Sequence, residues 1–212
     1  MNPEVVSGII CELGEGPLWD DSKKKICWVD ILNGNIHEWS SITNILNTIS
    51  VGQMIGAMAL SDKGNYIAAV KDGFVFINRK TGKVDMIKNP ETHLPENRFN
   101  DGKCDPVGRF WAGTMPIAED KSSGSLYVLD ASLNVGKKES NIPDGMTIDN
   151  EGMLWIAHWG GWQVARYDPG TGKKLLSISM PVSQVTSCAF GGETMEDLYI
   201  TSARKGLSEL EL

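Results

Sequence analysis

Short β-prone runs and polar turns alternate along the whole chain, and the alternation recurs at a constant spacing. Five segments share one plan, in which small or apolar residues lead into a turn with Asp, Asn or Gly and then into a run rich in aromatic and β-branched residues. The turns begin at residues 20, 62, 105, 149 and 192, so the steps are 42 to 44 residues long. A repeat of this length made of short strands is typical of a four-stranded β-propeller blade.

The second half of each repeat adds further strand signals. The run 73–78, for example, leads through Thr81-Gly82 into a second β-prone run at 84–87. No long amphipathic helix is predicted, and the alternative for such a pattern, a two-sheet sandwich, would not need a constant period. The sequence therefore predicts an all-β protein with one propeller domain over residues 1–212.

The last repeat is short. Only eight residues follow Arg204, which is too few for two more strands. We expect a strand near Val5–Cys11 to pair with the last blade, because an unpaired sheet edge is a liability.

Composition and charge narrow the classes of function. The chain is 41% hydrophobic and 22% charged, as in globular proteins, and no apolar run approaches the roughly 18 residues of a membrane span. No basic region precedes a hydrophobic segment at the N-terminus, so we expect a cytoplasmic protein without a membrane partner. The net charge of −7 argues against a nucleic-acid partner, which would require a basic face. The four cysteines are far apart and contain no Cys-x-x-Cys pair, so they are interpreted as buried free thiols.

Acidic residues that could bind a metal or a substrate lie just before the first strand of three repeats. Glu15, Asp101 and Asp144 each lie beside a glycine at this place. The stretch Asn97–Lys103 is too polar for a buried strand and is interpreted as a loop built to hold a ligand. Oxygen ligands that converge from several loops suit a hard divalent cation. Each residue taken alone also fits an ordinary solvated turn, and Arg98 alone fits a surface cation.

Other catalytic signatures are absent from the sequence. It contains no G-x-S-x-G, H-E-x-x-H, P-loop or EF-hand motif. His158 is interpreted as structural, and His37 and His93 as surface residues. The tryptophans are interpreted as core residues, with Trp159 and Trp162 as alternative candidates for a substrate entrance.

Several longer motifs resemble one protein family. They are GEGPLWD at 14–20, NRFNDGKCDPVGRFWAGTM at 97–115, IPDGMTIDNEGMLWIAHWGG at 142–161 and TSCAFGG at 186–192. With these motifs the chain resembles the gluconolactonase, regucalcin (senescence marker protein) and luciferin-regenerating family along nearly its whole length. The resemblance implies a six-bladed propeller with a divalent metal, calcium or zinc, in its channel. It also implies hydrolysis of a small-molecule sugar lactone.

The resemblance assigns roles to individual residues. It implies that Glu15 and Asp144 ligate the metal, that Asp144 also acts as the base, and that Arg98 and Asn100 contact substrate. Asp101 would support the site. The family has a further acidic substrate contact just after GTM, a place occupied here by either Glu119 or Ala118.

Two departures from the family pattern change the expectation. The family has a blade with an asparagine ligand between the segments that correspond to Asp130 and Ile142, and only eleven residues separate these positions here. The family also continues after the TSAR segment. We therefore expect a propeller shortened by about one internal blade and the C-terminal strands, leaving about five blade repeats with the last incomplete. Two functions stay open, a metal-dependent lactonase and a metal-binding or interaction propeller impaired in catalysis. The sequence does not indicate the oligomeric state.

Overall fold

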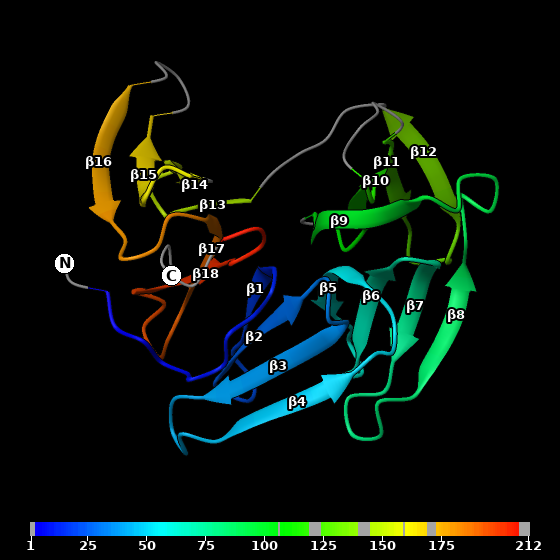
Figure 1. Cartoon of the computed structure of the whole chain (residues 1–212). Coiled ribbons are helices and arrows are strands. Elements are labelled where there is room, and N and C mark those ends of the chain that lie inside the picture. The colour runs from blue at the N-terminus through cyan, green and yellow to red at the C-terminus, as the bar shows by residue number, and fades with distance from the viewer. Residues whose placement is uncertain are drawn as a thin grey trace. The chain divides into compact units, whose positions relative to one another are not determined.

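The structure is a computed structural model that describes residues 3–105, 107–118, 124–139, 145–158, 160–168 and 173–207. All helix or strand structure in these ranges is β, as Figure 1 shows. No described segment forms a helix long and apolar enough to cross a membrane. The strands are β1 (Gly14–Asp20), β2 (Lys25–Asp30), β3 (Asn35–Ser40), β4 (Leu46–Ser50), β5 (Ile55–Leu60), β6 (Tyr66–Val70), β7 (Gly73–Ile77), β8 (Val84–Lys88), β9 (Asn97–Cys104), β10 (Phe110–Pro116), β11 (Leu126–Leu129), β12 (Val135–Glu139), β13 (Met146–Ile148), β14 (Leu154–His158), β15 (Gln163–Tyr167), β16 (Lys174–Ser179), β17 (Val185–Gly191) and β18 (Asp197–Ser202).

The strands form sheets strictly in chain order. Four sheets have four strands each, β1–β4, β5–β8, β9–β12 and β13–β16, and β17 pairs with β18 alone. Each of these sheets is a meander of sequential strands, and its turns fall where the sequence predicted them. This confirms the all-β propeller fold, while the number of blades stays a prediction.

The chain divides into two compact units. The first unit comprises residues 1–28, 37–48 and 144–212, and the second comprises residues 29–36 and 49–143. The two units are described separately below. The prediction of one domain over the whole chain stays a prediction.

The core of the second unit is aromatic and alanine-rich. Phe74 lies with its ring centroid 4.8 Å from that of Phe99 and 5.9 Å from that of Phe110, and all three side chains are buried. Buried small residues from the neighbouring strands fill the space around the rings: Ala57, Ala59, Ala69 and Ala112. Large rings against small residues give the interdigitation that close packing requires.

The first unit packs around tryptophans. Trp155 is buried with Val164, Val185 and Cys188. Trp19 stacks on Tyr199 at a centroid distance of 5.7 Å. The interpretation of these strand tryptophans as core residues is therefore confirmed for Trp19 and Trp155.

A recurring hydrogen bond closes two of the sheets at the turn after their first strand. Trp111 Nε1 donates to Asp105 Oδ2, and Trp155 Nε1 donates to Asp149 Oδ2, both at 2.9 Å. We call these two pairs the Asp–Trp latches. An arginine also contacts each latch aspartate: Arg109 Nε lies 2.6 Å from Asp105 Oδ2, and Arg166 Nε lies 2.7 Å from Asp149 Oδ2.

Some predictions about local structure were wrong. Residues 3–11 form no strand, and the pairing near the N-terminus is a single bridge between Leu13 and Ala203. A run with Pro3, Gly8 and exposed Val5 lacks the alternation that holds a strand against a sheet. The cysteines are free, but Cys104 is exposed rather than buried.

Candidate functional site

The stretch Asn97–Lys103 is not a loop. It forms most of β9, the first strand of its sheet, and Asn97, Arg98 and Phe99 are all buried. Phe99 anchors the strand in the core, and because side chains alternate along a strand, Arg98 and Asn100 point to the opposite face. A register shift between Ala112 and Thr114 of the paired strand β10 marks a bulge at this point. The strand is buried at its start, around Phe99, and exposed at its end, at Lys103 and Cys104.

Arg98 and Asn100, predicted to act together, do lie together. Arg98 Nη1 donates to Asn100 Oδ1 at 2.8 Å and to the carbonyl oxygen of Phe99 at 3.1 Å. Arg98 is only 3% exposed. The guanidinium is therefore held at a fixed place on β9 rather than solvated as a surface cation.

Gly56 on β5 sets how closely the neighbouring strand approaches this pair. A Cβ atom at Gly56 would collide with the backbone oxygens of Asn100 and Phe99. A glycine inside a β-prone run is the sequence signal for such a close backbone approach, and it went unused in the sequence interpretation.

A cavity of about 110 Å³ lies beside Arg98. Its walls carry both cationic and anionic side chains: Lys71, Asp72, Glu91 and Arg98, with Asn89, Asn97 and Thr114 among the polar remainder. A cavity with donors and acceptors of this kind suits a small polar ligand or water better than an apolar one.

Glu91 is a buried carboxylate on this cavity that sequence reasoning missed. Its Oε2 accepts from Asn97 Nδ2 at 3.0 Å, and its Oε1 accepts from Thr114 Oγ1 and from Tyr127 OH, each at 2.9 Å. Burial raises the pKa of Tyr127 to about 12, with the Glu91 hydrogen bond adding to the effect, so the phenol remains a donor. Glu91 follows Asn89-Pro90, a pattern that reads as a surface turn, and no sequence signal marks it as buried.

Glu15 lies in the first unit, as the second residue of β1. It is 5% exposed, and its Oε2 accepts from the Gly16 amide at 3.0 Å. Gly14 precedes it at a close backbone contact, where a Cβ atom would lie 2.7 Å from the carbonyl oxygen of Ser202. Thr186 Oγ1 also donates to the Gly14 carbonyl oxygen. A packed strand, not a solvated turn, therefore carries Glu15.

Of the remaining predicted site residues, the structure describes Asp101 but not Asp144 or Glu119. Gly145, the neighbour of Asp144, packs so tightly against Thr186 and Ser187 that a Cβ atom there would collide with the Thr186 carbonyl oxygen. Asp101 is half-buried, and its Oδ1 accepts from the Gly102 amide at 2.7 Å.

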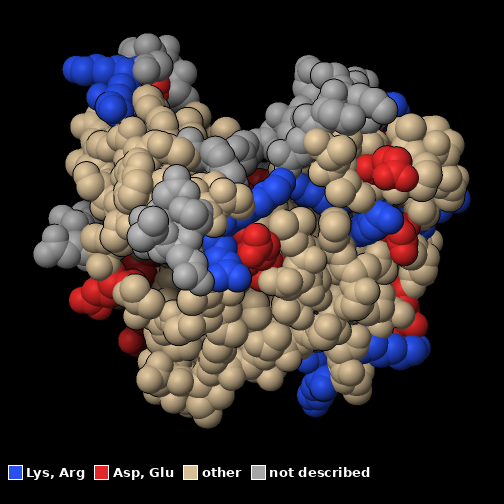
Figure 2. Space-filling view, viewed as in Figure 1, with Lys and Arg blue, Asp and Glu red and all other residues tan. Residues whose placement is uncertain are grey.

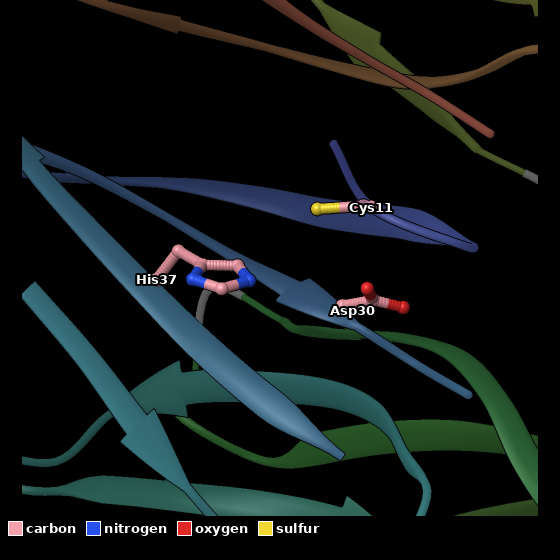
Figure 3. Close-up of side chains that lie close together, drawn as sticks. All are labelled: Cys11, Asp30 and His37. Atoms are coloured by element: carbon pink, nitrogen blue, oxygen red, sulfur yellow. The ribbon is translucent and has the colours of Figure 1, made fainter. Parts of the chain in front are cut away.

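The interpretation of His37 as a surface residue was wrong. His37 is 3% exposed, its Nδ1 lies 2.9 Å from Thr48 Oγ1, and its ring packs on Trp28. Figure 3 shows the ring near the Cys11 thiol, and a ring nitrogen and the sulfur lie within 4.8 Å of each other. A thiol and an imidazole differ from the hard oxygen donors expected for a calcium site.

Charges of both signs occur on the surface. Figure 2 shows acidic and basic side chains together on the face that it draws. This mixture agrees with the modest net charge of −7.

Comparison with known proteins decides the family. The model of the SMP-30/Gluconolactonase/LRE-like region matches residues 13–142 and 133–204. The chain belongs to this family. The resemblance seen in the motifs is thereby confirmed.

Individual family members agree in sequence and in fold. A Bacillus subtilis (strain 168) protein, YvrE, whose name proposes sugar lactone lactonase activity, is 33% identical over 251 residues, covering 94% of this chain and 86% of that protein. Regucalcin of Bos taurus is 32% identical over 254 residues, covering 93% and 85%. The crystal structure of regucalcin, a calcium-binding protein from Agrobacterium tumefaciens str. C58, superposes with a TM-score of 0.91 at 26% identity and covers 97% of this chain and 87% of that one.

These alignments are longer than the chain itself. The 251 positions aligned with YvrE exceed the 212 residues present here. The relatives therefore carry segments that this chain lacks within the aligned region.

Proposed function

We propose that the protein is a divalent-metal-dependent hydrolase of sugar lactones. The observation that carries the proposal is the buried Arg98 on β9, which donates to Asn100 and lines a polar cavity in a chain of the gluconolactonase family. A guanidinium and an amide fixed in this way supply donors and an acceptor for the hydroxyl groups of a sugar ring. The cytoplasmic location expected from the sequence remains part of the proposal.

The one predicted metal ligand among the described residues, Glu15, fits a divalent cation. Glu15 is a buried carboxylate on a packed strand, and a carboxylate oxygen is the donor that calcium prefers and that zinc accepts. When bound, such a cation polarises a carbonyl group and lowers the pKa of water. Glu15 and Asp144 would hold it, with calcium or zinc as the candidates.

The protein's own residues would do the rest of the work. Arg98 and Asn100 would bind and orient the lactone by its hydroxyl groups. Asp144 would take a proton from the attacking water as the water oxygen bonds to the lactone carbonyl carbon. The ring C–O bond would then break, and the proton would pass to the departing ring oxygen, which becomes a hydroxyl group of the open-chain sugar acid. No covalent intermediate on the protein is required.

A second function is favoured by one specific observation. Relatives carry segments absent from this chain, and the resemblance places an asparagine ligand in such a segment. A site without that ligand would bind its cation more weakly, which leads to a metal-binding or interaction propeller with little catalysis.

The deciding experiment measures hydrolysis of a set of aldonolactones with and without added Ca²⁺ or Zn²⁺. We expect metal-dependent turnover in the wild type that falls by at least about 100-fold in Asp144→Ala, as for loss of a general base. Calorimetric titration of the same metals should show weaker binding in Glu15→Gln than in the control Glu12→Gln. Metal binding without any turnover would select the second function. Unchanged metal binding in Glu15→Gln would show that Glu15 is not a ligand.

A further inference from the structure

We infer that Glu91 is a positioning residue for substrate binding, acting on the lactone through Asn97 and Arg98. The inference rests on the proposed function, because it takes Arg98 as the residue that contacts the sugar. Glu91 is 7% exposed and lies in the segment between β8 and β9.

Three strands converge on the Glu91 carboxylate. The donors come from the start of β9 (Asn97), from β10 (Thr114) and from β11 (Tyr127). Thr114 is itself fixed, because the Ser125 amide donates to its Oγ1 at 2.9 Å. The carboxylate is therefore anchored to the sheet on one oxygen and to Asn97 on the other.

The hydrogen bond from Asn97 to Glu91 is one residue away from Arg98 along the backbone. Asn97 directly precedes Arg98, and both are buried beside the cavity that Glu91 also lines. Backbone hydrogen bonds also hold the segment before them. The backbone N–H of Asn97 donates to the Leu94 carbonyl oxygen at 3.0 Å, and the backbone N–H of Leu94 donates to the Glu91 carbonyl oxygen at 2.8 Å. Glu91 thus fixes where β9 begins, and with it the point from which the Arg98 side chain extends.

The two oxygens of Glu91 have different donors, so a substitution that replaces one of them can separate the two sets of hydrogen bonds. In Glu91→Gln only one acceptor oxygen remains, so the side chain cannot accept from Asn97 and from the hydroxyls of Thr114 and Tyr127 at once. Two donors face one oxygen and a single donor faces the other. With the oxygen kept toward the two hydroxyls, the new amide group faces the Asn97 side-chain amide, donor against donor, and the connection toward Arg98 is lost while the one toward β10 and β11 remains. Glu96→Gln, an exposed change of the same charge in the same segment, is the matched control.

We expect Glu91→Gln to raise KM for an aldonolactone by about tenfold, the effect of one hydrogen bond to a charged group, with kcat and the affinity for the metal changed less than twofold. Glu96→Gln should leave all three unchanged. Calorimetric binding of gluconate, an open-chain sugar acid, gives the same test without turnover. Should Glu91→Gln fail to fold, Asn97→Ser removes the same connection while leaving the carboxylate in place.

A double-mutant cycle separates positioning from a merely structural role. If Glu91 acts through Arg98, the tenfold effect of Glu91→Gln disappears in an Arg98→Ala background. An effect that persists in that background, or an unchanged KM in a folded Glu91→Gln protein, overturns the inference while leaving the proposed function standing. If Arg98→Ala changes neither lactone nor gluconate binding, the substrate role of Arg98 fails, and the inference fails with it.

Discussion

Two sheets of the molecule, β9–β12 and β13–β16, are built on the same local plan and end up in different environments. Each is closed by an Asp–Trp latch of the same length, 2.9 Å. Yet the first strand of one sheet, β9, buries Asn97, Arg98 and Phe99, whereas β13 leaves Met146 43% and Ile148 60% exposed.

The difference shows what a repeat does and does not determine. The latch is local, because its donor and acceptor are six residues apart in both sheets. Burial of the first strand depends on the neighbouring sheet: β9 packs on β5, and its Phe99 packs against Phe74 of β7. A side chain such as Arg98 can be held in place for binding only where that packing is complete.

The substitution with the largest expected effect removes the aromatic side chain that packs β9 into the core. Phe99→Ala should lower the free energy of unfolding by about 3–5 kcal/mol, because it empties a buried aromatic site between Phe74 and Tyr127. The counterpart Met146→Ala, on the exposed strand, should cost under about 1 kcal/mol. Denaturant titrations of both variants measure the two values. Equal losses would mean that β9 and β13 are packed alike after all.

A second test keeps the side chains of β9 and disturbs only its support. Gly56→Ala places a methyl group against the backbone of Asn100 and Phe99, and overpacking of this kind costs about 1–3 kcal/mol. Because β9 must move, the binding of gluconate, in which Arg98 and Asn100 are proposed to take part, should weaken as well.

Gly64→Ala is the control for Gly56→Ala. Gly64 has a φ of 72° and open space around its Cβ position, so the substitution should cost about 1 kcal/mol through backbone strain alone. Gluconate binding should be unchanged in Gly64→Ala. If both variants weaken binding to the same degree, general destabilisation rather than β9 displacement explains the loss.

The sequence was sufficient for features with a local cause. The repeat of turns predicted the sheets in order, and the family motifs brought Arg98 and Asn100 together as a pair. It was insufficient where burial came from elsewhere in the chain. Asn97–Lys103 was interpreted as a loop because its composition is polar, and Phe74, which packs against its Phe99, lies 25 residues earlier in the chain.

The same limit applies to single residues. His37 was read as a surface residue because the packing of Trp28 and Thr48 around it is tertiary. Glu91 has no marker in its own segment, since its three donors come from three separate strands. Gly56 did carry a signal, a glycine inside a strand, and a general rule about close approach would have found it.

The smallest expected effect concerns the Asp–Trp latches. Here the substitution in the β13–β16 sheet should lower stability more than the one in the β9–β12 sheet, the reverse of the order expected for Phe99→Ala and Met146→Ala. Partial burial favours the neutral form of Asp105, but hydrogen bonds from Trp111 and Arg109 outweigh it and lower its pKa to about 2. In Asp149 the hydrogen bond from Arg166 is the main cause of a lowered pKa, with Trp155 adding to it. Both latches include an arginine, but the Arg166 side chain is 19% exposed and the Arg109 side chain is 48% exposed. Water screens the less exposed ion pair less, so the Asp149 latch should matter more, although it belongs to the less buried sheet.

The sign of the pH dependence follows from these shifts. A carboxyl group whose pKa is lower in the folded state stabilises the protein fully above its unfolded pKa of about 3.9, and this stabilisation is lost as the pH falls through the folded pKa. We expect Asp149→Asn to lower the melting midpoint at pH 7 more than Asp105→Asn, each on the order of a few degrees. Between about pH 4 and pH 2, the Asp105 contribution should fade, so that wild type and Asp105→Asn converge in melting midpoint, and the Asp149 contribution should likewise fall as the pH falls. Melting curves across this range decide the matter, and a larger effect of Asp105→Asn at pH 7 would show that burial of the sheet, not the partners of its latch, sets the strength of this interaction.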